Sequence, residues 1–366
     1  MDDQRLPWVA LNCVLAEYPQ PFKRVVERYH PLAEVFGVGA GDLMRLGLDE
    51  KSAQKITSSW ALDEARKELE KAEKKNYAVL TLEDKEYPEY LREIFDPPFV
   101  LYCAGKVEVL SELAVAMVGA RKPTPYGSAV AEKLAFELAS RGLVVVSGLA
   151  RGIDSIAHWG AVKGGKTVAV LGSGLENLYP KENRQLFEKI TAQGAVVSEY
   201  SLSSPPLGFH FPLRNRILSG LALATVVVEA TRLSGSLITA HFALEQNREV
   251  MAVPGNITSE LSQGTNWLIQ KGAVLVRDWT DIAENLPSPL RENLLAQKRE
   301  EKVSRPNLSP EDDRIFRCLK TDSLVQIDEL VEQTGYSVSE LLARLLAWEL
   351  EGWIVQCPGK YFQRRI

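Results

Sequence analysis

The sequence predicts an α/β protein whose central domain is a doubly wound parallel sheet, with a small helical domain before it and a winged-helix domain after it. Three observations support this fold class. Short apolar runs alternate with helical stripes between residues 76 and 287, only helical spacing occurs before them, and three helical patterns followed by a hairpin signal close the chain. A length of 366 residues allows two or three domains.

The composition is that of an ordinary globular protein. Hydrophobic residues make up 45% and charged residues 25% of the chain, which excludes a disordered or collagen-like sequence. The longest nearly apolar run, Ile217–Val228, is shorter than the ~20 residues that a membrane-spanning helix needs. The acidic start Met1–Arg5 lacks the basic and then apolar pattern of a secretory signal. We therefore expect a cytoplasmic protein without a membrane span.

Neither the cysteines nor the histidines form a metal-binding pattern. The cysteines lie far apart without a C-x-x-C pair, and no two histidines have metal-ligand spacing on one predicted helix. These residues are Cys13, Cys103, Cys318 and Cys357, and His30, His158, His210 and His241. We expect no metal, no cofactor and no disulfide framework.

The charge is unevenly distributed along the chain. The net charge of −5 by itself disfavours nucleic acid as a partner. However, residues 114–216 contain twelve Lys or Arg against seven Asp or Glu, which is a local excess of +5. An excess of this kind can attract a polyanion to the central domain.

Residues 1–75 are predicted to form a helical domain of the SAM or helix-hairpin-helix type. The turn Val35–Gly39, followed by Leu43 and Leu46, resembles a helix-hairpin-helix turn. Glycines in such a turn let the backbone approach a DNA phosphate. The alternative is a packing module, because helices joined by glycine turns are common.

Residues 76–287 are predicted to form an extended Rossmann-like domain. Its apolar runs are typical of buried parallel strands. The runs are Ala114–Val118, Leu143–Val146, Thr167–Leu171, Ala195–Ser198, Thr225–Val228, Val250–Val253 and Ala273–Val276. Ala131, Leu134, Ala135 and Leu138 form the stripe of a helix that lies on a sheet. Ligands of such folds bind beyond the carboxyl ends of the strands.

The loops after the first two strands are candidate phosphate sites. Residues 119–128 combine small residues and a helix start with Arg121 and Lys122, which favours anion binding. Residues 147–154 form a second tight turn, with Arg151 at its mouth. The alternative for either loop is an ordinary turn with a solvated arginine.

The loop after the third strand contains part of a dinucleotide fingerprint. Gly172 and Gly174 match its first two glycines, but Asn177 stands where the third is needed. Glu199, at the next strand end, could bind a ribose hydroxyl. Because this is the third turn of the domain and not the first, NAD binding is disfavoured.

Two further segments favour nucleic acid. Arg214, Asn215 and Arg216 follow Phe209 and Phe211, and cations mixed with aromatic rings suit single strands. The alternative is a helix start with surface arginines. A last loop opens a helix with small residues at 234–236, which adds an anion-binding end. No G-x-S-x-G elbow or nucleophile–base–acid series accompanies these loops.

Residues 288–307 are predicted to be a linker, and residues 308–366 a winged helix. Helical patterns near 311–319, 326–334 and 338–351 precede a hairpin with a Pro-Gly turn. The third helix carries only Arg344 as a cation, which disfavours groove reading and favours a protein contact or a vestigial role. Contact with phosphate stays open through Lys360, Arg364 and Arg365.

The loop motifs, in their order and spacing, resemble the DNA-processing protein A family (DprA, also called Smf). They are Gly119–Arg121, Tyr126–Gly127, Ser147–Asp154, Ala157–His158, Gly174, Tyr179–Pro180, Asn183, Arg214–Ile217, Ser234–Ser236 and Pro254–Asn256. The motifs cover residues 77–286, and the flanking domains look like those of the longer members.

The resemblance implies a non-catalytic recombination mediator. Family members bind single-stranded DNA, protect incoming DNA, dimerise through the Rossmann-like domain, load the RecA recombinase during natural transformation and help displace single-strand-binding protein. The DNA pocket implied for this chain consists of Arg121, Ser147, Gly148, Arg151, Lys181, Asn183, Arg214 and Arg216. The loops themselves add Gly119, Lys122, Asn215, Ser234, Gly235 and Ser236.

The main alternative is a nucleotide-binding enzyme similar to the phosphoribohydrolases of the lysine-decarboxylase-like family, which share this type of domain. Their P-G-G-x-G-T-x-x-E signature is missing here. The segment Pro254–Ile257 lacks the second glycine and the catalytic acid.

Overall fold

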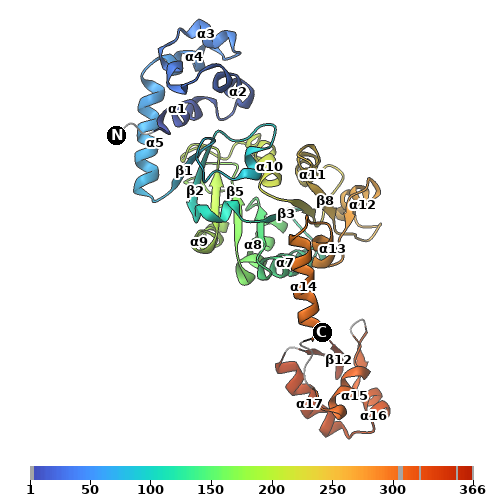
Figure 1. Ribbon diagram of the computed structural model, residues 1–366. Helices are drawn as coiled ribbons and strands as arrows, with labels where there is room; N and C mark the ends of the chain where they lie inside the picture. Colours follow the sequence, from blue (N-terminus) through green and yellow to red (C-terminus); the bar gives the residue numbers. More distant parts are fainter. Residues whose placement is uncertain (1–3, 304–307, 321–322, 352, 365–366) are drawn as a thin grey trace. The chain divides into compact units, whose positions relative to one another are not determined.

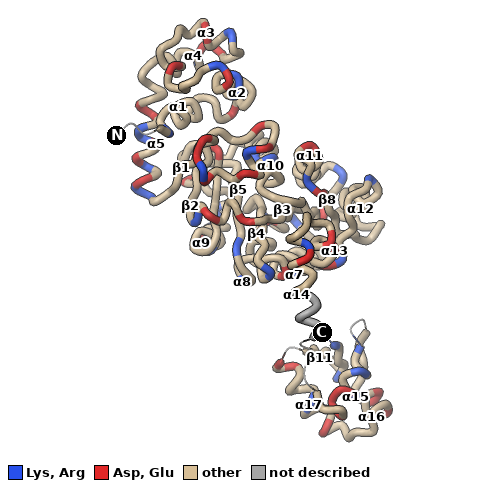
Figure 2. Tube along the Cα trace, in the orientation of Figure 1, with Lys and Arg blue, Asp and Glu red and all other residues tan. Residues whose placement is uncertain are grey.

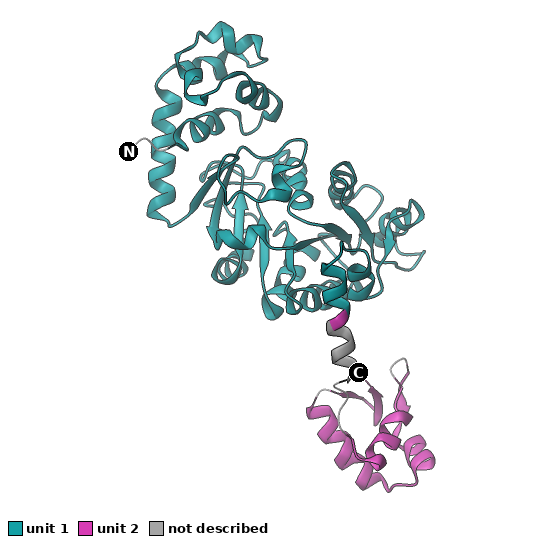
Figure 3. Ribbon diagram, in the orientation of Figure 1, with its two compact units in different colours: residues 1–295 teal, residues 296–366 magenta. Residues whose placement is uncertain are grey.

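A computed structural model describes residues 4–303, 308–320, 323–351 and 353–364. The chain divides into two compact units, residues 1–295 and 296–366 (Figure 3). The first three residues of the acidic start and Arg365, which entered the sequence predictions, lie outside the described residues. No helix in the described ranges is both long enough and apolar enough to span a bilayer.

Residues 6–74 form short helices, as their periodicity predicts. They are α1 (Leu6–Leu15), α2 (Pro19–Arg28), the 3₁₀ helix η1 (Leu32–Gly37), α3 (Ala40–Arg45), α4 (Glu50–Thr57) and α5 (Trp60–Lys74). Their core residues, among them Leu11 and Phe22, belong to the same hydrophobic cluster as Tyr102 and Leu171 of the sheet domain. The helices and the sheet therefore share one core. In the glycine turn, Gly39 has φ −78°, which any residue can adopt.

The sheet of the larger unit has nine strands in the described residues (Figure 1). They are β1 (Ala78–Thr81), β2 (Val100–Gly105), β3 (Ala114–Val118), β4 (Val144–Ser147), β5 (Thr167–Val170), β6 (Ala195–Ser198), β7 (Ala224–Val227), β8 (Glu249–Ala252) and β9 (Val274–Leu275). Their order is β1-β2-β6-β5-β4-β3-β7-β8-β9. The strands from β3 to β9 pair in parallel, which confirms the predicted doubly wound sheet.

The strands β1 and β2, at one end of the sheet, were not predicted. They pair antiparallel with each other, and β2 pairs antiparallel with β6. The short helix α6 (Glu89–Arg92) is the α-helix between them. Because this connection lacks a helical stripe, the pair does not show the strand–helix alternation by which the other strands were recognised.

Helices cover both faces of the sheet. They are α7 (Pro125–Ser140), α8 (Ile153–Gly164), α9 (Arg184–Gln193), α10 (His210–Gly220), α11 (Gly235–Glu245), α12 (Gln263–Gln270) and α13 (Trp279–Glu284), with the 3₁₀ turns η2 (Val107–Ser111), η3 (Lys181–Asn183) and η4 (Glu260–Ser262). Alternate residues of β3 face opposite ways, since Val115 and Met117 cluster with α7 and α8 whereas Ala116 and Val118 cluster with α10 and α11. Helices α7 and α8 therefore pack on one face of the sheet, and α10 and α11 pack on the other.

The smaller unit is a winged helix, as predicted. Its elements are α15 (Pro310–Cys318), β10 (Val325–Gln326), α16 (Ile327–Thr334), α17 (Val338–Leu350), β11 (Ile354–Cys357) and β12 (Tyr361–Arg364). Ser309 caps α15, and Ser337 with Glu340 forms a capping box on α17. Within the predicted linker, α14 (Leu290–Val303) is helical. The domain boundaries at residues 75, 287 and 307 stay predictions.

Candidate functional site

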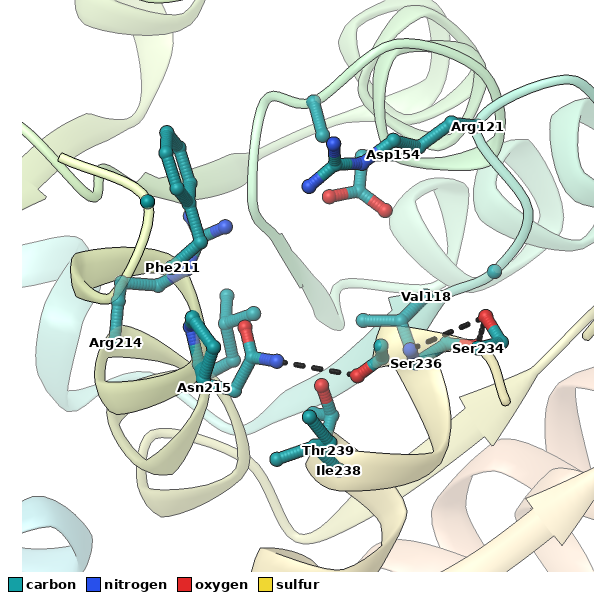
Figure 4. A pocket seen from close by; sticks show the side chains of 16 residues that line it. Val118, Arg121, Asp154, Phe211, Arg214, Asn215, Ser234, Ser236, Ile238 and Thr239 are labelled. Atoms are coloured by element: carbon teal, nitrogen blue, oxygen red, sulfur yellow. Dashed lines mark hydrogen bonds between the residues drawn. The ribbon is translucent and has the colours of Figure 1, made fainter. Parts of the chain in front are cut away.

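The sheet changes direction at β3. From β3 the chain adds β4, β5 and β6 on one side and then returns to add β7, β8 and β9 on the other. The loops after β3 and β7 lead to helices on opposite faces, which leaves a crevice at the carboxyl ends of these strands. A cavity of about 290 Å³ lies there (Figure 4). Its walls are the loops after β3 and β4, helix α10 and the start of α11. We call it the switch-point cavity.

Arg121 is the exposed cation of the switch-point cavity. It follows β3, and its side chain lies beside Asp154 in the close-up (Figure 4). Arg121 donates no hydrogen bond to another described residue, and no carboxylate of those residues lies within ion-pair distance. Its guanidinium is therefore available to an anion that enters the cavity.

Arg214 lines the same cavity but is buried, with 4% of its surface exposed. Its Nη1 donates to the carbonyl oxygen of Gly148 at 2.9 Å and to that of Val170. Burial lowers the pKa of Arg214 to about 10, and the charge of Asp154 opposes this shift. Burial likewise raises the pKa of Asp154, and Arg214 opposes that shift. The two buried side chains therefore attract each other through their opposite charges in the wall of the cavity.

Gly148 makes room for this pair. Its N–H donates to Asp154 Oδ2 at 3.2 Å. A Cβ at this position would stand 2.5 Å from Arg214 Nη2 and 2.6 Å from Asp154 Oδ2. A side chain here would push the two charges apart, so the glycine of the second motif serves the buried pair.

Arg216 does not reach the switch-point cavity. Its guanidinium is buried and forms a two-pronged ion pair with Glu199, at 2.8 and 2.6 Å. Positions i and i+2 of a helix point in different directions, so Arg214 and Arg216 cannot share one pocket. The prediction of Arg216 as a pocket residue needs this correction. The pairing also occupies Glu199, the acid that an NAD site would need.

Two other predicted residues hold loops in place. The buried Ser147 donates from Oγ to the carbonyl oxygen of Met117 at 2.6 Å. Asn183 donates from Nδ2 to the carbonyl oxygen of Leu149 and to Ser155 Oγ, both at 2.8 Å. Neither side chain lines the cavity.

The remaining predicted cations are exposed residues outside the cavity lining. Arg151 Nε donates to Glu182 Oε1 at 2.5 Å, so this arginine already has a carboxylate partner. Lys122 and Lys181 are exposed and donate to no other described residue. The structure thus brings together Arg121 and Arg214 and leaves Lys122, Arg151 and Lys181 apart from them.

Helix α11 presents its N-terminus to the cavity. Ser234 caps the helix by accepting a hydrogen bond from Ser236 N–H at 3.4 Å, and the two hydroxyl groups lie 2.7 Å apart. Asn215 Nδ2 donates to the carbonyl oxygen of Gly235 at 3.3 Å, which links α10 to this end. The dipole of α11 favours an anion here.

Aromatic rings lie beside the cavity. Phe211 lines it, and its ring centroid is 5.7 Å from that of Tyr179. Phe209 is half exposed one residue before α10. Rings at the mouth of an anion site can stack on the bases of a nucleic acid whose phosphates are held nearby.

Two acids were missed as site residues by sequence reasoning. Asp154 pairs with Arg214, and the buried Glu229 accepts hydrogen bonds from Thr124 N–H at 2.9 Å and Thr124 Oγ1 at 2.5 Å. Glu229 thereby fixes the loop after β3 to the end of β7. For Glu229, the available signal was an acidic residue directly after the apolar run Thr225–Val228.

The fold and the site define a Rossmann-like protein whose switch-point cavity combines an exposed arginine, a helix N-terminus and aromatic rings. The described residues contain no group of three or more His, Cys, Asp or Glu able to hold a metal ion. An exposed arginine, a helix N-terminus and aromatic rings in one cavity are typical of proteins that bind phosphate-bearing ligands.

The chain belongs to the DNA recombination-mediator protein A family, whose model matches residues 78–287. Residues 299–360 match the DprA winged helix domain. Protein Smf of Escherichia coli is 36% identical, over 98% of this chain and 95% of that protein. These matches confirm the resemblance to DprA and Smf.

Solved structures agree with this membership. The X-ray structure of DprA from Streptococcus pneumoniae has a TM-score of 0.68 and 36% identity, and the match covers 76% of this chain and 96% of that chain. DprA from Helicobacter pylori has a TM-score of 0.52 and 30% identity, over 61% and 96%. The latter structure describes a single-stranded DNA binding mode of the Helicobacter protein.

Proposed function

We propose that this chain binds single-stranded DNA at the switch-point cavity and acts there as a non-catalytic recombination mediator. The observation that carries this proposal is the exposed Arg121, which has no hydrogen-bonding partner among the described residues and shares the cavity with the capped N-terminus of α11. Both groups attract phosphate. Arg121 interacts with the charge of Asp154 but forms no ion pair with it, so its guanidinium donors can reach a ligand.

The rings beside the cavity favour a single strand over a duplex. Phe209, Phe211 and Tyr179 can stack on bases only where the bases are unpaired and turned outward. A duplex keeps its bases stacked inside, so its phosphates alone would be available. We expect little sequence preference, because every base offers a face for stacking.

The arrangement of the acids supports binding without catalysis. Asp154 is the one carboxylate among the described residues that line the cavity; it accepts a hydrogen bond from Gly148 N–H and is attracted to the charges of Arg214 and Arg121. A general acid or base must instead reach the substrate. A phosphoribohydrolase-like activity thus finds no free carboxylate among the described lining residues.

The cellular role in this proposal comes from family membership. It comprises protection of incoming DNA, loading of RecA during natural transformation and help in displacing single-strand-binding protein, all in the cytoplasm. It also includes a homodimer formed through the Rossmann-like domain. A dimer would present two cavities to one strand, which raises the overall affinity through effective concentration.

The predicted residues take two roles in this proposal. Direct contact with DNA is assigned to the cavity residues and the exposed lysines, which are Gly119, Arg121, Lys122, Lys181, Asn215, Ser234, Gly235 and Ser236. Arg151 joins them only when it leaves Glu182. Support of the loops is assigned to the buried or internally bonded residues, which are Ser147, Gly148, Asn183, Arg214 and Arg216.

Fluorescence anisotropy with a labelled single strand of about 30 nucleotides and its duplex tests the proposal. We expect salt-sensitive binding that favours the single strand. Arg121→Ala should weaken binding about tenfold, because a charge-assisted hydrogen bond is lost. It should also reduce the slope of log K against log salt by about 0.7. Arg344→Ala in the winged helix removes the same charge and serves as the control.

Three results would contradict parts of the proposal. Absence of single-strand binding at low salt would overturn the function. Unchanged affinity in Arg121→Ala would remove this residue from the site. A strong preference between oligo-dT and mixed sequences would contradict binding through the backbone and stacking.

A further inference from the structure

A second groove lies between the N-terminal helices and the sheet domain, within the larger unit. Its cavity is about 490 Å³. Helices α1 and α4 and the turn between α1 and α2 form one wall, and the segment after β6 forms the other. We call it the interdomain groove. Neither the sequence motifs nor the proposed DNA site includes it.

The interdomain groove has two cations without a carboxylate partner. Lys51 and Lys55 stand one turn apart on α4, so they share a face of this helix. No carboxylate of the described residues lies within ion-pair distance of either ammonium group. The Lys55 ammonium lies 4.4 Å from the ring centroid of Trp60, a cation–π contact that does not neutralise its charge.

The acids of the groove are already engaged. Asp49 caps α4 by accepting hydrogen bonds from Ser52 N–H at 2.9 Å and Ser52 Oγ at 2.6 Å. Glu17 Oε1 lies 3.1 Å from His210 Nε2 of α10. Both acids keep their charge, and the groove contains as many acidic as basic residues. The ammonium groups of Lys51 and Lys55 nevertheless have no carboxylate partner of their own among the described residues and can donate to a ligand.

An aromatic ring accompanies these lysines. Tyr18 lines the groove with 48% of its surface exposed. Unpaired cations beside an exposed ring are the features that a single strand uses when it binds through its backbone and by stacking. The groove thus repeats the chemistry of the switch-point cavity on different elements.

The interdomain groove and the switch-point cavity are neighbours. Ser204 lines the groove and Gly208 lines the cavity, and four residues of chain can separate them by at most roughly 14 Å. The half-exposed Phe209 follows Gly208 directly. The contact between Glu17 and His210 joins the two walls at this point.

We propose that a single strand held in the switch-point cavity continues past Phe209 into the interdomain groove, so that the N-terminal helices form a second segment of the DNA path. This inference rests on the proposed function of the cavity. It assigns DNA contact to α4 and Tyr18 and not to the glycine turn at residues 35–39. Lys51 and Lys55 bind phosphates there, and Tyr18 offers a ring to a base.

Two oligo-dT lengths separate the two sites. A strand of about five nucleotides can fill the cavity alone, whereas one of about twenty can enter both sites. Lys51→Ala with Lys55→Ala should leave the affinity for the short strand unchanged. For the long strand it should lower affinity roughly fivefold and reduce the salt slope by about 1.4, which corresponds to two lost phosphate contacts.

Lys67→Ala with Lys74→Ala is the matched control, because it removes the same charge from α5 without touching the groove. This control should bind both lengths like the unchanged protein. Tyr18→Ala provides an independent variant, and it too should weaken only the long strand. Binding of the short strand shows in each case that the cavity has folded.

The outcomes are distinct. If the unchanged protein binds neither length, the proposed function fails, and this inference fails with it. If it binds both, but the lysine variant matches the control or weakens both lengths equally, the cavity function stands and the path through the groove is overturned. Selective loss with the long strand supports the path.

Discussion

The domain that holds the switch-point cavity and the winged helix both match DprA family models, yet an arginine of the first is unpaired and an arginine of the second is ion-paired. Arg121 in the cavity donates to no other described residue. Arg344 on α17 forms ion pairs with Glu311 at 3.4 Å and Asp312 at 3.0 Å, and its guanidinium lies 4.6 Å from the ring centroid of Tyr336. The partners of an arginine, and not its presence in a DNA-binding motif, therefore decide whether its guanidinium can bind a phosphate.

The surroundings reinforce this difference. Helices α15 and α16 begin with acidic residues, which are red in Figure 2. On α17, Leu346 and Leu350 stand one turn apart and are 57% and 82% exposed. The helix that would read a DNA groove thus offers apolar side chains and an engaged arginine, which supports a protein contact for this unit.

The largest expected effect is a difference in the free energy of unfolding between variants of the buried Arg214 and of the half-exposed Arg344. Arg214→Leu should lower the free energy of unfolding of the larger unit by about 3–5 kcal/mol, because Asp154 would stay buried without its cation. Arg344→Leu should lower that of the winged helix by about 1 kcal/mol or less. Urea denaturation followed by circular dichroism measures both.

A double variant tests the cause of the larger effect. Arg214→Leu with Asp154→Leu removes both charges, so it should recover part of the stability lost in the single variant. If the double variant is as unstable as the sum of the two single changes, packing and not the charge pair explains the loss. Equal losses of stability in Arg214→Leu and Arg344→Leu would contradict the claim that burial makes the loss of Arg214 more costly.

The next largest effect is a loss of stability in acid that comes from a buried histidine. Only the larger unit contains histidines, so only this unit should show it. Burial, with a further contribution from Arg214, lowers the pKa of His158 to about 3, whereas an unfolded histidine titrates near 6.5. Between these values the unfolded state binds a proton that the folded state does not. Stability from this group is therefore lost as the pH falls below 6.5, by about 2 kcal/mol at pH 5.

His158→Gln isolates this response. The difference in unfolding free energy between the unchanged protein and the variant should shrink by about 2 kcal/mol from pH 7 to pH 5. All four histidines lie in residues 1–295, so the winged helix should show no such dependence on histidine. A constant difference across this range would mean that the pKa of His158 in the folded protein is not lowered from its unfolded value.

The fold was largely predictable because buried parallel strands lack a polar face. Apolar runs located the strands from β3 to β9, and proline, serine and glycine signals located the winged helix. Strands β1 and β2 escaped because the short α6 between them gives no helical stripe. Pairing between strands far apart in the chain is a tertiary property that local spacing does not contain.

The site was predictable as loops but not as side chains. The sequence placed Arg214 and Arg216 in one motif, yet tertiary partners decide where each guanidinium lies. Arg214 donates to the carbonyl oxygens of Gly148 and Val170, and Arg216 pairs with Glu199. The same holds for Arg151 and its partner Glu182. Partners that are distant in sequence, or on other turns, cannot be identified from the motif itself.

The smallest expected effect comes from releasing Arg344 of the winged helix from its carboxylate partners, so that it resembles Arg121 in the cavity. Glu311→Gln with Asp312→Asn removes both carboxylates that engage Arg344 and leaves its guanidinium free. If free donors determine phosphate binding, duplex affinity should rise a few-fold, since one exposed charge pair contributes about 0.2–1 kcal/mol. Binding of a short single strand to the cavity should not change.

Asp328→Asn with Glu332→Gln changes the net charge of the same unit equally but touches neither carboxylate partner of Arg344. Anisotropy with a labelled duplex, at low and moderate salt, compares the two variants. A gain confined to the first variant would show that Glu311 and Asp312 restrain Arg344. A gain shared by both would reflect general charge, because long-range attraction depends on the net charge of the unit and not on one freed guanidinium.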